Sequence, residues 1–72
     1  MLIINLRKAS YQTKELINLI FEKIDNNVYI SNCSSRVRIN AWKQIMNDIA
    51  VLNAKLIFSD ASEKGYRILK KS

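Results

Sequence analysis

The chain has 72 residues and carries 12 lysines and arginines against 6 acidic residues, a net charge of +6. This length allows one domain at most, residues 1–72, and the apolar share of 49% is typical of a folded chain rather than a disordered tail. Cys33 is the only cysteine and histidine is absent, so the sequence has no disulfide framework and no recognisable metal-binding cluster. Because the domain is small, we expect it to gain stability as a homodimer.

The positive charge is concentrated in the second half of the chain. Residues 36–72 contain eight cationic and three acidic side chains, whereas residues 1–35 contain four and three. Such a balance suits a polyanionic partner: nucleic acid, an anionic membrane surface or an acidic protein. The apolar run Met1–Ile4 is too short for a signal peptide or a membrane span, so we expect no membrane association. A lone cysteine, Cys33, fits a reducing compartment, so we expect a cytoplasmic protein.

The first half of the chain predicts a strand, a helix and a second strand. Met1–Leu6 is apolar and partly β-branched, which favours a strand. A helix is predicted over Gln12–Asp25, with Ser10 or Thr13 as its N-cap, and a short strand over Val28–Ile30. The apolar residues at helical spacing are Leu16, Ile17, Ile20 and Ile24.

The stretch Ile39–Leu69 predicts one amphipathic helix followed at once by a β-hairpin. The hairpin strands are expected at Lys55–Ser59 and Gly65–Lys70, joined by Asp60–Lys64. Gly65 is the only glycine and is expected to adopt a positive φ where the hairpin turns back. The apolar stripe of the helix consists of Trp42, Ile45, Met46, Ile49, Leu52 and Leu56.

Residues 31–39 allow two interpretations, which lead to different folds. In the first, Ser31–Arg38 is a short helix, and Asn40 then caps the following helix with its side-chain oxygen. The element order is then β-α-β-α-α-β-hairpin, an α+β fold.

That order and spacing resemble winged-helix DNA-binding domains. In this resemblance Gln12–Asp25 is the first helix and Val28–Ile30 the small strand that joins the wing sheet. Ser31–Arg38 corresponds to the positioning helix, Asn40–Asn53 to the recognition helix and Lys55–Lys70 to the wing. The leading strand is an addition to the pattern. The resemblance implies a winged-helix-like protein that reads DNA with the helix from residue 40.

In the second interpretation, Arg36–Ile39 is a strand, because polar and apolar residues alternate there with period two, and Asn32–Ser35 is a turn. The order becomes β-α-β-β-α-β with an extra strand, which resembles the ferredoxin-like split βαβ arrangement. Some members of that fold bind RNA on the sheet face through exposed aromatic residues. The chain offers Tyr29 but not a paired aromatic motif.

Asn40, Lys43, Gln44 and Asn47 share one face of the predicted helix and include no acid. Asparagine and glutamine amides can pair with adenine, and lysine can reach guanine or phosphate, so this face could enter a major groove. The alternative is that these residues form the solvated side of an ordinary amphipathic helix.

Cations before and after this helix are candidates for phosphate contact. Arg36 and Arg38 precede it, where phosphates are often clamped, although charges also protect a solvated edge strand from unwanted pairing. Basic residues of the wing could contact phosphates or the minor groove, although such residues also serve solubility alone. These wing residues are Lys64, Arg67, Lys70 and Lys71.

The sequence therefore predicts a small dimeric protein that binds double-stranded DNA, a transcriptional regulator. One alternative is a protein-binding inhibitor or adaptor that docks on an acidic partner, and another is an RNA binder on a split βαβ sheet. An enzyme is not expected, because the chain has no paired carboxylates, no glycine-rich phosphate loop and no nucleophile motif. No catalytic residue, cofactor or metal is predicted.

Overall fold

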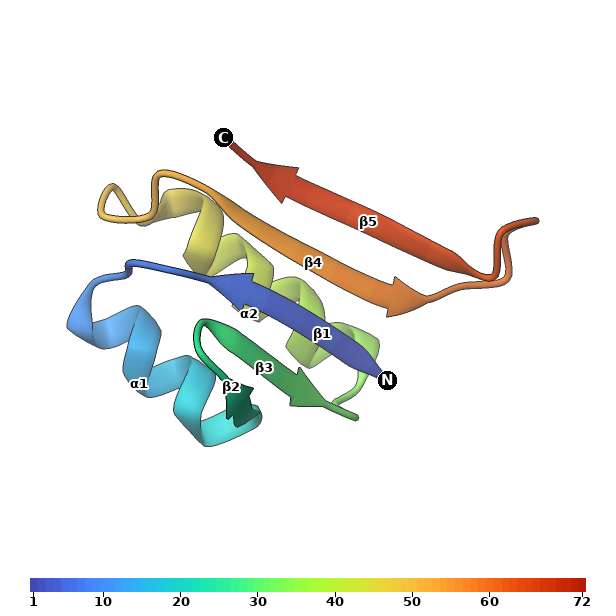
Figure 1. Cartoon of the computed structure of the whole chain (residues 1–72), viewed down its shortest axis with the longest axis horizontal. Coiled ribbons are helices and arrows are strands. Elements are labelled where there is room, and N and C mark those ends of the chain that lie inside the picture. Colours follow the sequence, from blue (N-terminus) through green and yellow to red (C-terminus); the bar gives the residue numbers. More distant parts are fainter.

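A five-stranded antiparallel sheet forms one layer of the protein and two helices form the other, as Figure 1 shows for the computed structural model of residues 1–72. The strand order across the sheet is β2-β3-β1-β4-β5. Neither helix is long and apolar enough to cross a membrane. In chain order the elements are β1 (Leu2–Leu6), α1 (Tyr11–Ile20), β2 (Glu22–Asp25), β3 (Val28–Ser31), α2 (Ser35–Asn47), β4 (Ala54–Ser59) and β5 (Tyr66–Lys71).

The topology consists of two interleaved β-α-β units. The strands of the first unit, β1 and β2, are separated in the sheet by β3, and the strands of the second unit, β3 and β4, are separated by β1. This is the ferredoxin-like split βαβ arrangement. β5 is an additional edge strand that pairs with β4 along its length. The alternative fold predicted from the sequence is therefore confirmed at the level of architecture, and the winged-helix fold is wrong.

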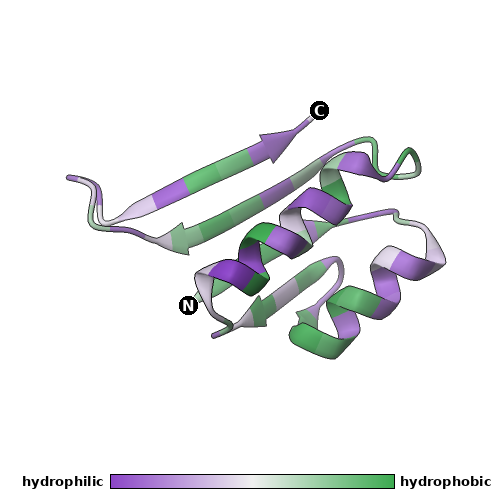
Figure 2. Ribbon diagram, turned by 180° about the vertical axis from the view of Figure 1, so that it is seen from behind, coloured by the Kyte–Doolittle hydropathy of each residue, from purple (hydrophilic) through white to green (hydrophobic).

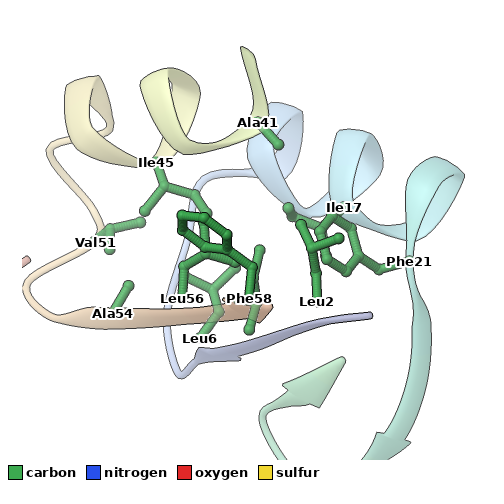
Figure 3. Close-up of a cluster of buried hydrophobic side chains, with 11 residues drawn as sticks. Leu2, Leu6, Ile17, Phe21, Ala41, Ile45, Val51, Ala54, Leu56 and Phe58 are labelled. Atoms are coloured by element: carbon green, nitrogen blue, oxygen red, sulfur yellow. The ribbon is translucent and has the colours of Figure 1, made fainter. Parts of the chain in front are cut away.

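The hydrophobic core lies between the sheet and the helices. Alternate residues of β1 and β4 point toward the helices, and they are opposite one another in register, as in the pairs Leu2 with Phe58 and Ile4 with Leu56. Ile17 from α1 and Ile45 from α2 complete the cluster, and both are fully buried (Figure 3). Burial of these aliphatic side chains is the main force that holds both helices on one face of the sheet.

Both helices begin at a serine N-cap. The Ser10 hydroxyl accepts a hydrogen bond from the Thr13 amide at 3.4 Å, and the Ser34 hydroxyl accepts one from the Val37 amide at 3.3 Å. Each cap satisfies an otherwise unpaired amide of the first turn. Of the two predicted caps for the first helix, Ser10 takes the role.

The predicted helix Gln12–Asp25 is too long at its C-terminal end. α1 stops at Ile20, and Phe21 is in extended conformation and buried in the core. Residues 22–25 form β2, which pairs with β3 through a turn in which Asn27 has a φ of 62°. Residues 22–25 continue the helical spacing of α1, but their pairing with β3 makes them a strand. The tight turn between the two strands is possible because asparagine tolerates the left-handed backbone conformation that it needs.

Both interpretations of residues 31–39 misplace the second helix. Ser31 still belongs to β3, and α2 runs as one helix from Ser35 to Asn47. The predicted short helix Ser31–Arg38 and the predicted strand Arg36–Ile39 are therefore both wrong. Asn40 is not a cap, because it lies inside α2 after the start of the helix at residue 35.

The predicted recognition helix, Asn40–Asn53, also ends too late. Asp48 forms the C-cap of α2, and the chain then loops back toward β4. Two residues assigned to the apolar stripe are exposed in this loop, Ile49 at 96% and Leu52 at 73%. The hairpin, in contrast, was predicted within one residue at each end, and Gly65 has the expected positive φ of 79°.

Candidate nucleic-acid interface

The polar face predicted to read bases lies on α2. Asn40, Lys43 and Asn47 are exposed to solvent. Gln44 is partly engaged within the fold, because its Nε2 donates a hydrogen bond to Thr13 Oγ1 on α1 at 3.4 Å. Seen from the helix side, α2 carries hydrophilic stretches between its hydrophobic ones (Figure 2). The polar face of α2 is therefore the outer side of a helix that packs on the sheet.

Arg36 and Arg38 have different surroundings although they are two residues apart on α2. Arg36 is exposed. The guanidinium of Arg38 is half-buried and stacks on the Phe58 ring of β4, with 3.8 Å between its central carbon and the ring centroid. This cation–π contact stabilises the packing of the first turns of α2 on the sheet. Arg38 therefore has a structural role in the fold.

The predicted cations at the tip of the β4–β5 hairpin are exposed. Lys64 lies in the connection between the strands. Arg67 forms an ion pair with Asp60, in which Arg67 Nε lies 3.0 Å from Asp60 Oδ2. The Asp60 amide donates to the Gly65 carbonyl and closes the turn at 3.0 Å. The charge of Arg67 is thus partly compensated at the tip.

Lys70 and Lys71 point to opposite faces of the sheet. Lys71 pairs in register with Ala54 of the buried face, and its Nζ donates to the Ile45 carbonyl at 2.9 Å and the Asp48 carbonyl at 2.8 Å. Both carbonyls already accept backbone amides, from Asp48 and Val51, so the ammonium adds a second bond at the C-terminal end of α2, where a cation also interacts well with the helix dipole. Lys70 is exposed on the other face and pairs in register with Lys55.

The structure therefore does not bring the predicted residues together into one surface. In a winged-helix domain a recognition helix and a wing lie side by side. Here α2 covers one face of the sheet, and Lys70 lies on the opposite face. Lys64 lies in the turn between β4 and β5, whereas Arg67 pairs in register with Phe58, on whose ring Arg38 stacks, and so lies on the helix-covered side near α2.

The face of the sheet that the helices leave open carries a row of isoleucines. Ile30, Ile3, Ile57 and Ile68 are opposite one another in register across β3, β1, β4 and β5. Ile68 is 41% exposed and the other three are half-buried against their neighbours. We call these four residues the isoleucine row. The row was not predicted from the sequence, although the apolar runs of β1 and β4 make both faces apolar, which is typical of strands covered on both sides.

A second row lies next to the isoleucine row on the same face. Asn5, Lys55 and Lys70 are opposite one another in register across β1, β4 and β5, and we call them the basic row. They border a depression of about 370 Å³. Its remaining lining residues are Asn53, Ala54, Lys71 and Ser72. Of the basic row, only Lys70 was a predicted site residue, because the exposed position of Lys55 depends on the strand register.

Asp48 is the centre of a polar cluster that joins the two helices. Its Oδ2 accepts hydrogen bonds from the Ser10 amide at 2.9 Å and the Ser10 hydroxyl at 2.8 Å, and its Oδ1 accepts one from the Ala50 amide at 2.9 Å. Hydrogen bonding with the Thr13 side chain, followed by the Ser10 and Ala50 amides, holds the pKa of Asp48 well below its ordinary value. The carboxylate thus ties the start of α1 to the end of α2.

The acidic residues of the chain do not converge. No group of three or more histidine, cysteine, aspartate or glutamate side chains is arranged so that it could hold a metal ion. Tyr29, the aromatic residue considered for RNA stacking, is opposite Ile4 and therefore lies on the helix-covered face. Tyr66, in contrast, belongs to the open face, because it is opposite Ser59.

Fold and surface together define a class: a small basic protein of ferredoxin-like fold with one uncovered sheet face. Comparison with known families goes further, because residues 1–71 match the family described as CRISPR-associated protein (Cas_Cas2CT1978). The chain belongs to this CRISPR-associated, Cas2-like family. No curated protein matches the chain.

Family membership corrects the function predicted from the sequence. The family is CRISPR-associated and is not a winged-helix family, so the predicted transcriptional regulator is wrong. The fold explains the error: no separate positioning helix precedes α2, and α2 instead packs on the sheet beside α1. The alternatives of an adaptor or an RNA binder agree better with the family.

Proposed function

We propose that the protein is a homodimeric subunit of a CRISPR system. In this role it binds double-stranded DNA and docks with a partner protein. Cas2 proteins typically act as dimers together with Cas1 and nucleic acid, and the match over residues 1–71 supports the same role here. The observation that carries the proposal is the isoleucine row on the open face of the sheet.

The isoleucine row fits a second copy of the chain. Four aliphatic side chains in register make a continuous apolar strip, and monomeric proteins rarely leave such strips uncovered. A twofold axis would place the same strip of a second copy against it, which is the commonest geometry of homodimers. A domain of this size also gains a larger share of buried surface by pairing.

A single charge on the row tests the dimer. Ile57→Lys places an ammonium in the middle of the proposed interface, so we expect the variant to be monomeric by sedimentation velocity at concentrations where the wild type is dimeric. Ile49→Lys is the matched control, because Ile49 is 96% exposed in the loop after α2 and should leave the dimer intact. A monomeric wild type, or dimers in both variants, would contradict the proposal.

Binding to nucleic acid is supported by the net charge of +6 and by cations that the fold leaves free. Among the predicted residues, Arg36, Lys43, Lys64 and Lys70 are exposed and form no ion pair. The affinity for random-sequence duplex DNA should fall steeply as salt rises, because each phosphate contact releases counterions. Fluorescence anisotropy titrations at several salt concentrations measure this slope, and absence of duplex binding at low salt refutes the DNA-binding function.

The expectation that the chain is not an enzyme needs a direct test, because Cas2-type proteins are often nucleases. A metal-dependent nuclease needs carboxylates that converge on the ion, and those of a single chain do not. Asp48, the most buried acid, is occupied by the hydrogen bonds to Ser10 and Ala50. We expect single-stranded RNA and duplex DNA to stay intact with Mg²⁺ or Mn²⁺, and cleavage that co-purifies with the dimer would reverse this expectation.

A further inference from the structure

We propose that the side of α2 that faces away from α1 is a docking site for an acidic amphipathic helix of a partner protein. The site combines three apolar residues of α2 with one of β5, and we call it the α2–β5 surface: Ile39, Trp42, Met46 and Leu69. This inference rests on the proposed function, because it names the surface and the chemistry by which that function docks its partner. The isoleucine row lies on the opposite side of the sheet, so the proposed dimer leaves the α2–β5 surface accessible.

The apolar residues of α2 that take part lie on one face of the helix. Ile39, Trp42 and Met46 follow one another at intervals of three and four residues. Ile39 is 55% exposed, Met46 is 45% exposed and Trp42 is half-buried. Spacing of this kind is typical of the contact between two packed helices. The helix therefore has a second apolar face besides the one that it buries on the sheet through Ala41 and Ile45.

The contacts of α2 show on which side of the helix this second face lies. Gln44 Nε2 donates a hydrogen bond to Thr13 Oγ1, so the Gln44 side of α2 faces α1. An α-helix turns by about 100° per residue, so residues two positions before and after Gln44 lie on the far side of α2 from α1. These residues are Trp42 and Met46. Figure 1 shows that β5 lies on that side, with α2 between it and α1.

The helix-covered face of β5 has no helix directly over it. Packed helices lie about 8–10 Å apart and neighbouring strands about 4.8 Å apart, so one helix covers about two strands. The two helices thus suffice for about four of the five strands, and neither lies behind β5 in Figure 1. Leu69 is only half-buried, although it is opposite the fully buried Leu56. Beside α2 there is therefore width for one further helix.

The charges around this surface select an acidic partner. Neither α2 nor β5 contains an aspartate or a glutamate, whereas each contains three cations: Arg36, Arg38 and Lys43 on α2, and Arg67, Lys70 and Lys71 on β5. Arg36 and Lys43 are three and four residues from Ile39, so they border the apolar face, and both are exposed without an ion pair. Carboxylates on the flank of a docked helix would meet these two cations, whereas a basic helix would be repelled.

A helix fits this surface better than an additional strand on β5. Three of the six residues of β5 are cationic, and charged side chains on an edge strand discourage pairing with another strand. The apolar residues of α2, in contrast, have the spacing with which proteins bind the apolar face of an amphipathic helix. The occupant is therefore a helix with one apolar face and carboxylates along its flank.

The test uses a synthetic helical peptide of about 18 residues, with leucine at intervals of three and four residues and glutamate and alanine elsewhere. Its binding to the full chain is measured by fluorescence anisotropy. We expect the same peptide with lysine in place of glutamate to bind at least about tenfold more weakly. Met46→Glu should weaken binding of the acidic peptide about tenfold or more, because it places a carboxylate in the apolar contact. Leu19→Glu, which changes an exposed leucine of α1, is the matched control and should bind as the wild type does.

A charge reversal shows whether the cations select the partner. Arg36→Glu/Lys43→Glu should reverse the preference, so that the lysine peptide binds more tightly than the glutamate peptide. A merely structural role of these residues would weaken both peptides alike. Equal binding of the two peptides to the wild type, or wild-type binding by Met46→Glu, would overturn the proposed site. So would an equal loss of binding in Leu19→Glu.

Amide chemical shifts of the isotope-labelled protein locate the bound peptide without any substitution. We expect the shifts to change along α2 and β5, whereas changes confined to the isoleucine row or to the edge of β5 would contradict helix docking. The proposed function is tested separately, because Met46→Glu should form dimers and bind duplex DNA as the wild type does. A wild type that is monomeric or binds no duplex would refute that function, whatever the peptide does.

Discussion

The two faces of the sheet are made from the same strands, yet only one is completed within the chain. On the helix-covered face, Leu2, Ile4 and Leu56 are buried under α1 and α2. On the open face, the neighbouring residues Ile3 and Ile57 remain partly accessible, beside a row that carries two lysines. The covered face determines the fold, and the open face is available for contacts with other molecules.

The largest difference between the two faces should be seen in the free energy of unfolding when two adjacent residues of β4 are replaced by alanine. Leu56→Ala removes a fully buried side chain and should lower the free energy of unfolding by about 3 kcal/mol, a large part of the stability of so small a domain. Ile57→Ala, on the open face, should cost about 1 kcal/mol within one chain. Urea denaturation followed by circular dichroism measures both.

Protein concentration sharpens the same comparison. A residue at a dimer interface stabilises the folded state through association, so its effect depends on the concentration of the chain. The difference between Ile57→Ala and wild type should grow as the protein is made more concentrated, while the effect of Leu56→Ala stays constant. Equal behaviour of the two variants would remove the distinction between the faces.

The next largest effect is the pH dependence of stability that comes from the polar cluster around Asp48, which joins the two helices. Because the pKa of Asp48 is lowered in the folded state, its contribution to stability is complete above its ordinary pKa of about 3.9 and is lost as the pH falls below that value. Asp48→Asn should therefore destabilise the protein at pH 7, and the difference from wild type should shrink toward about pH 2. Urea midpoints across this range test the sign, and parallel curves would contradict it.

The smallest effect compares neighbours on β5 that point to opposite faces. Lys71→Met removes the hydrogen bonds to the end of α2 and should lower the free energy of unfolding by about 1 kcal/mol without changing duplex affinity. Lys70→Met should leave stability within about 0.5 kcal/mol and weaken duplex binding several-fold. Thermal melts and anisotropy titrations on both variants separate the roles, and a shared loss of affinity would mean that both lysines face the ligand.

Local patterns predicted the strands better than the helices. β1, β4 and β5 were recognised because apolar and β-branched runs end at clear turn residues, and Gly65 marked the turn of the hairpin. β2 was missed because Phe21 and Ile24 continue the helical spacing of α1, and only pairing with β3 makes them extended. The start of α2 was missed because one interpretation placed Ser34 inside the helix Ser31–Arg38 and the other placed it in the turn Asn32–Ser35, although it is the N-cap.

The candidate site was harder to predict than the fold, for a physical reason. Lys70 was chosen for its charge, but Lys55 and Asn5 come from strands far apart in the sequence and meet only through register. Arg38, Gln44 and Lys71 were chosen for their charge or polarity as well, and the structure engages them with Phe58, Thr13 and the end of α2. Sequence shows which groups can bind phosphate, whereas tertiary structure decides which are free to do so.

The bond between Lys71 and α2 also bears on the order in which the chain matures during synthesis. All elements from β1 to β4 are made before residue 71, so the ferredoxin-like unit can form first. Until then the carbonyls of Ile45 and Asp48 lack the ammonium group that binds them in the finished protein. The end of α2 should therefore reach its full stability only after β5 has paired with β4.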